Sequence, residues 1–205
     1  MSVLVYTENW DGRFKKSSFE LVSYAARLAA MLNTSAIALS IGKVENSELE
    51  KLGRYGVMKI VGMHGDQFTV LDNQVYTKAI SDAAKENAAT VIILSNNNTG
   101  KALAPRLSVK LKAGLGAGIS KLPLSVSPFV VYKRTYSGNA FAHLSINTEI
   151  KILTLAQNSF ELIETPGTPE IVNIAVQPDA GLIRTQIKEV RKLEGKILLT
   201  DAEIV

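Results

Sequence analysis

Short apolar runs alternate with segments of helical periodicity through the first half of the chain. Four runs of strand length occupy residues 3–6, 36–41, 59–63 and 90–94, and the last is the most continuously apolar. Between them, apolar residues recur every three or four positions, as in helices that pack one face on a sheet. This alternation predicts an α/β fold, in which a Rossmann-like parallel sheet carries helices on both faces.

The first helix is expected to begin at Ser17. Glu20 follows three residues later, which is the spacing of a capping box, where each side chain accepts a hydrogen bond from the other residue's backbone N–H. The helical pattern stops at Asn33. Its apolar face, which should pack on the sheet, consists of Leu21, Tyr24, Ala25, Leu28, Ala29 and Leu32.

Three further helices are expected in this half. One spans residues 48–55 and ends at Gly56, because glycine adopts the left-handed conformation of a helix C-cap without strain. Another is marked by apolar residues at helical spacing between positions 76 and 84. The last spans residues 101–112, with Pro105 in its first turn, where the missing N–H leaves no bond unmade.

The second half contains strand-like runs with no helical pattern between them. The turn residues Ser137, Gly138 and Asn139 separate the first two runs, which favours an antiparallel hairpin. We therefore expect an antiparallel strand extension joined to the parallel sheet. Residues 180–194 are charged and compatible with a helix. The strand-like runs are residues 129–133, 140–146, 150–155 and 171–176.

Composition narrows the classes of function. The 205 residues are 46% hydrophobic, with no cysteine and two histidines, which suits one buried domain without thiolate, iron–sulfur or metal chemistry. No apolar run approaches the roughly 20 residues of a membrane span. The opening residues show no signal or transit peptide, so we expect a cytoplasmic protein. The net charge of +4 is dispersed, and nucleic-acid binding is not expected.

A polar turn follows the most apolar strand, where open α/β sheets bind ligands. It lacks the first glycine and the Ser or Thr of a phosphate-binding loop, so it is not a Walker A motif. Two interpretations remain open. The side chains either cap the next helix or form a ligand site. The candidate residues are Asn96, Asn97, Thr99, Gly100 and Lys101.

Other motif candidates fail on spacing or context. Gly114, Gly116 and Gly118 begin like a dinucleotide fingerprint, but the third glycine comes one residue early and the cluster follows a helix. Backbone turning and close packing explain it better. His64 and His143 have no nucleophile or acid at a motif spacing, so we identify no catalytic residue and no metal ligand.

Four charged residues complete the set of candidates. Glu8 and Asp11 flank a tryptophan in the first loop and could pair, although Asp11 is better explained as a turn former. Arg106 and Arg134 are expected to make interface or interdomain ion pairs rather than ligand contacts, since arginine is favoured at protein interfaces.

Several segments, in order along nearly the whole chain, resemble the N-terminal domain of the alpha subunit of electron-transfer flavoprotein. The most specific features are the spacing of Gly100, Leu103, Pro105 and Arg106 and the Tyr136-to-Asn139 hairpin turn. The resemblance implies a fold related to adenine-nucleotide alpha-hydrolases. The matching segments are VLVYTENWDG, SSFELVSYAARLA, KLGRYGVMKIV, TGKALAPRLSVKLKAGLGAGISKL and VYKRTYSGNAFA.

The resemblance also implies a domain division. Residues 1–190 correspond to the N-terminal domain, and residues 191–205 to a linker and the truncated start of the FAD-binding domain. The chain ends before the Gly-Gly-Arg-Gly stretch of that domain, so we expect FAD in the full heterodimer and none bound to this chain alone. Residues 156–158 read Ala, Gln, Asn where the family usually has Arg and Pro, which removes a family arginine.

By the same resemblance, the full subunit pairs with a beta subunit and passes electrons between acyl-CoA or other dehydrogenases and an acceptor oxidoreductase. This chain would be a non-catalytic scaffold and subunit-interface domain. The alternative is a stand-alone module that binds or hydrolyses adenine nucleotides through the polar turn. The interface candidates are Arg106, Arg134, Tyr136 and Asn139.

Overall fold

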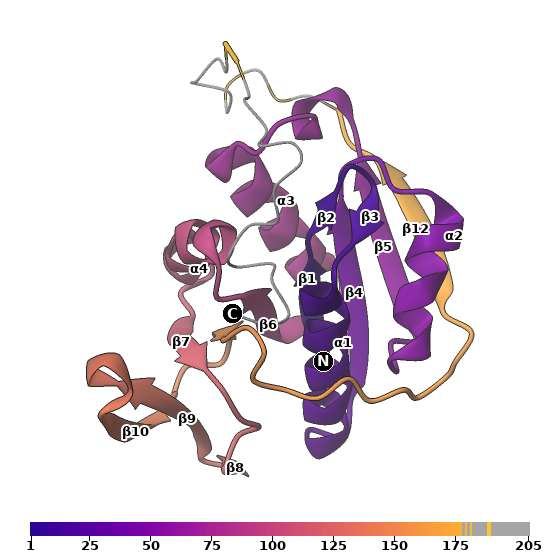
Figure 1. Cartoon of the computed structure of the whole chain (residues 1–205). Helices are drawn as coiled ribbons and strands as arrows, with labels where there is room; N and C mark the ends of the chain where they lie inside the picture. The colour runs from indigo at the N-terminus through magenta and orange to yellow at the C-terminus, as the bar shows by residue number, and fades with distance from the viewer. Residues whose placement is uncertain (178, 180, 182–187, 190–205) are drawn as a thin grey trace.

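A ten-stranded sheet, mostly parallel, forms the centre of the protein (Figure 1). The computed structural model describes residues 1–177, 179, 181 and 188–189. The strand order along the sheet is β10-β9-β7-β11-β6-β1-β4-β5-β12, with β8 paired to β9. The parallel strands are β7 (Gly114–Ile119), β11 (Lys151–Leu155), β6 (Ala89–Ser95), β1 (Ser2–Thr7), β4 (Ser35–Ile41), β5 (Lys59–His64) and β12 (Glu170–Ala175).

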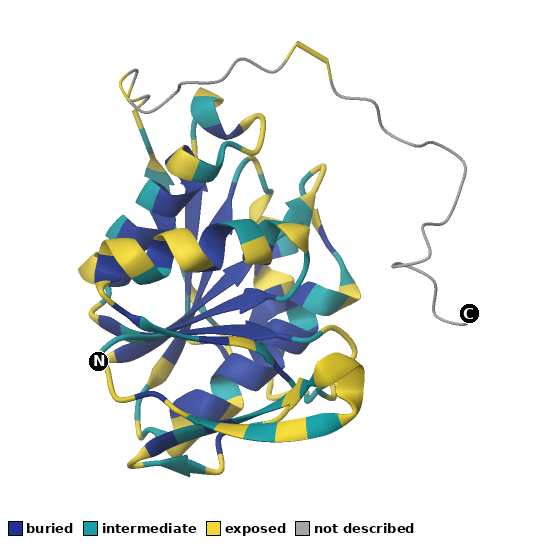
Figure 2. Cartoon of the chain, turned by 90° about the vertical axis from the view of Figure 1, so that its left-hand side faces the viewer, coloured by how far each residue is buried: buried dark blue, intermediate teal, exposed yellow. Residues whose placement is uncertain are grey.

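Helices cover both faces of this sheet. Figure 2 shows the buried strands, in dark blue, between these helices. Alternate residues of each strand point to opposite faces. Val3 and Val5 therefore pack in one core with α1, and Leu4 and Tyr6 in the other with α3 and α4. The helices are α1 (Lys16–Met31), α2 (Asn46–Leu49), η1 (Glu50–Arg54), η2 (Asp66–Phe68), α3 (Asn73–Glu86) and α4 (Asn98–Leu111). The predicted fold class is confirmed.

An antiparallel hairpin extends the sheet beyond β7. It consists of β9 (Phe129–Thr135) and β10 (Ala140–Ser145), joined by η3 (Tyr136–Gly138), while β8 (Ser125–Val126) pairs with β9. A small separate hairpin of β2 (Asn9–Trp10) and β3 (Arg13–Phe14) follows β1. The predicted hairpin is confirmed.

The position in the sheet of the two remaining late strands, β11 and β12, differs from the prediction. β11 lies between β7 and β6, and β12 pairs with β5, each in parallel orientation, so only part of the second half forms an antiparallel extension. The glycine-rich strand β7 went unpredicted. A Cβ on Gly114 would lie 2.4 Å from Cγ2 of Ile146, which confirms close packing as the reason for this glycine, while the φ of +68° at Gly118 confirms backbone turning there.

Two predicted helix starts are wrong. Helix α1 begins at Lys16, and its N-cap residue Lys15 makes no side-chain cap bond, so Ser17 and Glu20 form no capping box. Helix α4 begins at Asn98, with Asn97 as the cap, which places Pro105 inside the helix rather than in its first turn. The start of α4 is therefore marked by its cap residue Asn97, whose side chain accepts a hydrogen bond from a backbone N–H that has no partner within the helix.

Some expectations cannot be compared with the structure. The predicted helix at residues 180–194 falls largely outside the described residues, and the predicted linker at residues 191–205 falls wholly outside them. Within the described part of the chain, no helix is long and apolar enough to cross a membrane.

Candidate functional site

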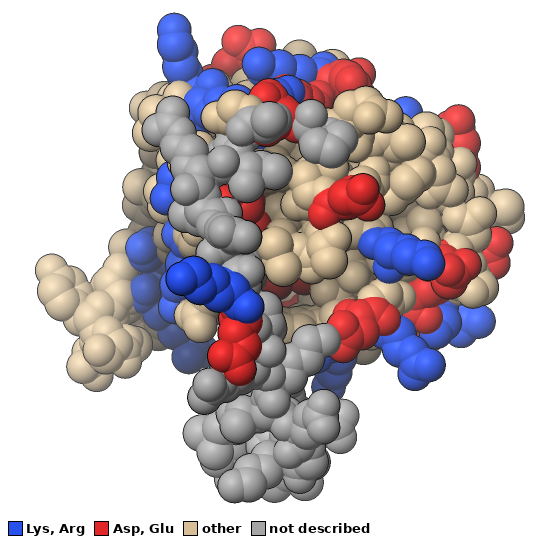
Figure 3. Space-filling model, turned by 90° about the horizontal axis from the view of Figure 1, so that it is seen from above, with Lys and Arg blue, Asp and Glu red and all other residues tan. Residues whose placement is uncertain are grey.

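A cleft of about 1250 Å³ opens at the carboxyl ends of β1, β4 and β5. Ligands of open α/β folds bind at this end of the strands. Figure 3 looks at the molecule from above, where acidic and basic side chains are mixed around the tan centre of the face. The cleft thus combines a ligand-sized volume with a polar, charged rim.

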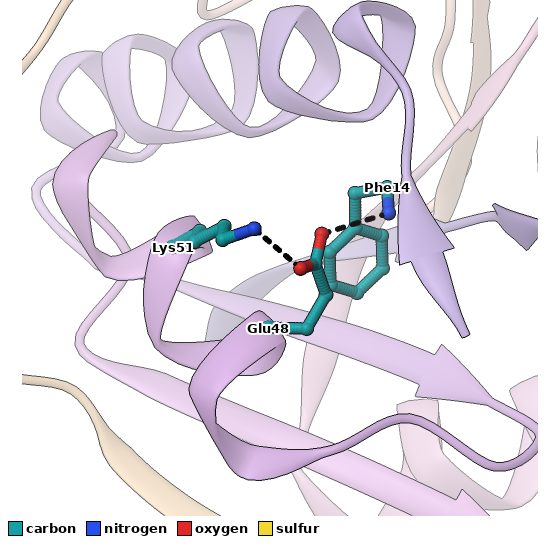
Figure 4. Close-up of polar contacts among 3 residues, drawn as sticks. All are labelled: Phe14, Glu48 and Lys51. Carbon is teal, nitrogen blue, oxygen red and sulfur yellow. Dashed lines mark hydrogen bonds and ion pairs between the residues drawn. The ribbon is translucent and has the colours of Figure 1, made fainter.

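One wall of the cleft is the β2–β3 hairpin, which Glu48 of α2 fixes in place (Figure 4). The backbone N–H of Phe14 donates to Oε1 of Glu48 at 3.1 Å, and Nζ of Lys51 donates to Oε2 at 2.5 Å. Burial alone would raise the pKa of Glu48, but these two hydrogen bonds and the Lys51 charge outweigh it and lower that pKa. The anchored hairpin gives the cleft a defined edge.

Glu8 lies where the strand order of the sheet reverses. The chain proceeds from β1 outward to β4 and β5 and then returns to β6 on the other side of β1. Nδ2 of Asn97, after β6, donates to Oε1 of Glu8, after β1, at 2.8 Å. Burial raises the pKa of Glu8, against smaller opposing effects of hydrogen bonds from Asn97 and Thr99 and of the Lys15 charge. This hydrogen bond therefore bridges the loops after β1 and β6 and places a carboxyl group at the switch point of the sheet.

The polar turn after β6 serves mainly to start α4. Oδ1 of Asn97 accepts from the backbone N–H of Gly100 at 2.8 Å, as expected of a helix cap. A Cβ on Gly100 would lie 1.7 Å from the carbonyl oxygen of Ser95, so only glycine fits there. Oδ1 of Asn96 accepts from the Thr154 hydroxyl at 3.0 Å, which ties the turn to β11.

Of the five residues proposed for this turn, the structure brings one to the cleft. Thr99 lines it beside Glu8, while Asn96, Asn97 and Gly100 face neighbouring backbone or side chains and Lys101 is exposed. The capping interpretation therefore accounts for Asn97 and Gly100. Sequence reasoning missed most of the cleft lining, because it comes from loops after β1, β4 and β5 that carry no motif.

The buried carboxylate Glu20 has a different role from the one that its spacing predicted. It is 4% exposed on α1 and accepts the backbone N–H groups of Asn158, Ser159 and Phe160, at 3.1, 2.7 and 2.9 Å. All three residues follow β11 in the chain, and Asn158 belongs to the 156–158 segment that lacks the family's Arg and Pro. Glu20 therefore holds the long segment between β11 and β12 against the α1 face of the sheet.

The glycine-rich segment offers no room for a dinucleotide. Side chains of Ile146 and Thr148 lie within 3 Å of a Cβ position on Gly114, and Leu153 lies 3.0 Å from one on Gly116. Gly118 has a φ of +68°, which glycine tolerates. The glycine-rich segment itself therefore forms no cradle for a dinucleotide. The described residues contain no cluster of three or more His, Cys, Asp or Glu able to hold a metal ion.

Three of the four interface candidates lie at one place, the far end of the β9–β10 hairpin. Arg134, Tyr136 and Asn139 are exposed there, whereas Arg106 is exposed on α4. Phe141 is 61% and Tyr136 82% exposed, an unusual degree for aromatic side chains.

The outward face of the hairpin combines aromatic and cationic side chains. Cross-strand partners Tyr132 and His143 lie beside Phe141, whose ring stacks on that of Tyr132 at 5.2 Å between centroids. Nζ of Lys121 lies 4.9 Å from the Tyr132 centroid. Exposed aromatic and arginine side chains are typical of protein interfaces. The other histidine, His64, lines the cleft at the end of β5.

These features define a doubly wound α/β domain that has an antiparallel hairpin and a hydrogen bond between the loops at its switch point. Residues 3–179 match the electron transfer flavoprotein domain family, and the chain belongs to that family.

Its relatives include alpha subunits. The chain is 24% identical, over 98% of its length and 62% of the relative's, to an electron transfer flavoprotein subunit alpha of Syntrophomonas wolfei. It is also 24% identical, over 99% of its length and 50% of the relative's, to subunit LctC of the lactate dehydrogenase (NAD(+),ferredoxin) of Acetobacterium woodii. The chain spans about half to three-fifths of the length of these relatives. The resemblance read from the sequence is confirmed.

Proposed function

We propose that this chain is the scaffold and subunit-interface domain of an electron transfer flavoprotein alpha subunit, a component of a cytoplasmic electron carrier rather than a catalyst. Family membership over residues 3–179 and the alpha-subunit relatives support this role. Its partner is a beta subunit, and the whole heterodimer carries FAD and exchanges electrons with acyl-CoA or other dehydrogenases and an acceptor oxidoreductase. Residues 1–190 form the scaffold and residues 191–205 lead toward the FAD domain.

The exposed aromatic face of the β9–β10 hairpin carries the proposal of an interface. Large aromatic side chains left in water lose the free energy that their burial would provide, and a partner surface recovers it. Tyr136 and Phe141 supply the apolar contact, and Arg134 and Asn139 supply polar ones. Such central aromatic and arginine residues contribute most of the affinity in typical interfaces.

Co-expression with the beta subunit of the same organism tests the interface. We expect a complex on size-exclusion chromatography that Phe141→Ser weakens by about tenfold or more, because hot-spot truncation removes at least roughly 2 kcal/mol. Val109→Ser is the matched control, since Val109 is 81% exposed on α4. If the Phe141 variant bound the beta subunit as tightly as the unaltered chain, the interface would lie on another surface. If neither the unaltered chain nor any variant formed a complex, the subunit role would be refuted.

The cofactor expectation follows from the same geometry. Side chains fill the space beside Gly114 and Gly116 of β7, and a hydrogen bond joins Glu8 to Asn97 in the turn after β6. We therefore expect this chain, mixed with FAD and desalted, to show no flavin absorbance, whereas the heterodimer with a full-length alpha subunit shows it. A stoichiometric yellow complex of this chain alone would contradict the proposal.

The nucleotide-binding alternative is tested by calorimetry with AMP and ATP. Micromolar binding would favour it. The Glu8 carboxylate beside Asn97 and Thr99 opposes a phosphate at the turn, so we expect no heat of binding from either nucleotide.

A further inference from the structure

Carboxylates outnumber cationic side chains in the cleft at the ends of β1, β4 and β5. Glu8, Asp11, Glu45 and Asp66 line it, and Lys43 is the only Lys or Arg among its described lining residues. In a partly enclosed site, where water screens charges less, this surplus attracts cations and repels phosphates. The charge of the cleft therefore differs from that of a nucleotide site.

Aromatic side chains form part of the same lining. Tyr6, Phe68 and Tyr76 pack edge to face in the wall, with centroids 5.6 Å apart for Phe68 and Tyr76. Trp10 is 55% exposed at the rim, and its ring already holds one ammonium group, Nζ of Lys15, 4.4 Å from its centroid. Aromatic faces attract organic cations through their quadrupole.

A buried hydroxyl in the lining has no hydrogen-bond partner among the residues that the structure describes. Ser40, near the end of β4, is 1% exposed, and its Oγ makes no hydrogen bond within the described residues. The amides of Asn46 and Asn173 line the same part of the cleft and bond to each other at 3.0 Å. Burying a hydroxyl without a hydrogen-bond partner is unfavourable, and a hydrogen bond from a ligand would remove that cost.

We infer that this cleft binds a small organic cation, a protonated amine carried on an aromatic or apolar body. The ammonium group lies among the carboxylates around Glu8, the apolar body packs against the aromatic wall and Trp10, and a polar group of the ligand reaches the amides near Ser40. This site is separate from the hairpin interface, and its test is independent of the subunit role.

Calorimetry on the whole chain with three probes tests the site. Phenethylamine supplies the ring and the ammonium group, phenethyl alcohol supplies the ring without the charge, and AMP supplies an aromatic anion. We expect phenethylamine to bind and the other two to give no heat. Glu8→Gln should weaken phenethylamine about tenfold, the effect of one charge-assisted contact, while Glu161→Gln, on an exposed residue outside the cleft, leaves it unchanged.

Other outcomes overturn the inference. Tighter binding of AMP than of phenethylamine would identify an anion site, and equal binding of the alcohol would show that charge is irrelevant. No binding of phenethylamine at millimolar concentration would also refute it. Asp66→Asn, a change of an exposed rim residue, replaces Glu8→Gln if that variant does not fold.

Discussion

The central parallel strands and the β9–β10 hairpin belong to one sheet but bury their side chains differently. All six residues of β1 are buried, since helices cover both faces, whereas residues of β10 alternate between intermediate and exposed. Burial in the first region explains why the domain folds. The open face of the second is exposed in the described chain, and under the proposed function it serves recognition. Substitutions in the two regions should therefore have separable effects on stability and on binding.

A large loss of stability is expected at the contact between α4 and β6. Gly100→Ala places a Cβ 1.7 Å from the Ser95 carbonyl oxygen, so the helix must move away from the strand. We expect a loss on the order of 4 kcal/mol in the free energy of unfolding, measured by urea titration. Gly167→Ala is the control, because the nearest atoms lie 3.9 Å from its Cβ position. A loss below about 1 kcal/mol at Gly100 would show that the turn adjusts freely.

Two phenylalanines of the hairpin compare its two faces directly. Phe129 is 3% exposed and packs in the α1-side core, while Phe141 is 61% exposed on the outward face. We expect Phe129→Ala to cost about 3–5 kcal/mol and Phe141→Ala less than about 1 kcal/mol by the same titration. Similar losses for the two variants would mean that the outward face contributes to the fold rather than to a partner contact.

A smaller loss is expected at Glu20. Glu20→Gln keeps the shape but removes the charge that accepts three backbone N–H groups after β11. We expect a loss of about 2 kcal/mol and faster hydrogen exchange at Ser159 and Phe160, because hydrogen bonds to charged groups contribute about 1.5–3 kcal/mol. Glu161→Gln, exposed on the same segment, should change neither quantity. Unchanged exchange at Ser159 would refute the anchoring role.

The same contrast explains what the sequence could predict. Strands buried on both faces are continuous apolar runs, so β1, β4, β5 and β6 were recognised. Strand β7 was missed because its three glycines give it no apolar run. Gly114 and Gly116 are explained by close packing from Ile146 and Leu153, and Gly118 by its positive φ. The order of β11 in the sheet depends on neighbours far away in the chain, which local patterns do not encode.

The candidate site was predicted less well than the fold. The turn after β6 was located correctly by its position, and Asn97 was correctly considered a cap. Glu20 fitted the capping-box spacing, but its carboxylate accepts hydrogen bonds from backbone N–H groups that lie at least 138 residues later in the chain. The cleft was not predicted, because its lining residues come together only in the folded chain and follow no regular spacing in the sequence.

The smallest change in stability is a gain, and it concerns Glu8. Burial raises the pKa of this carboxyl above 4.5 in the folded chain, against smaller opposing effects of hydrogen bonds from Asn97 and Thr99 and of the Lys15 charge. Between its ordinary and raised pKa, the folded state retains a proton that the unfolded state has lost. The free energy of unfolding therefore falls as pH rises through that window, and the ionised form remains less stable above it.

Glu8→Gln removes this penalty while an amide oxygen still accepts from Asn97. We expect the variant to be more stable near neutral pH by on the order of 0.5 kcal/mol, and the gain to disappear once the pH falls below the ordinary carboxyl pKa, where Glu8 is protonated in both states. Thermal unfolding across pH measures it, with Glu161→Gln as a pH-independent control. A variant that is more stable yet binds phenethylamine less would show that the buried charge is retained for the ligand, because functional groups often reduce stability. A variant less stable at neutral pH would instead assign Glu8 to the structure of the turn.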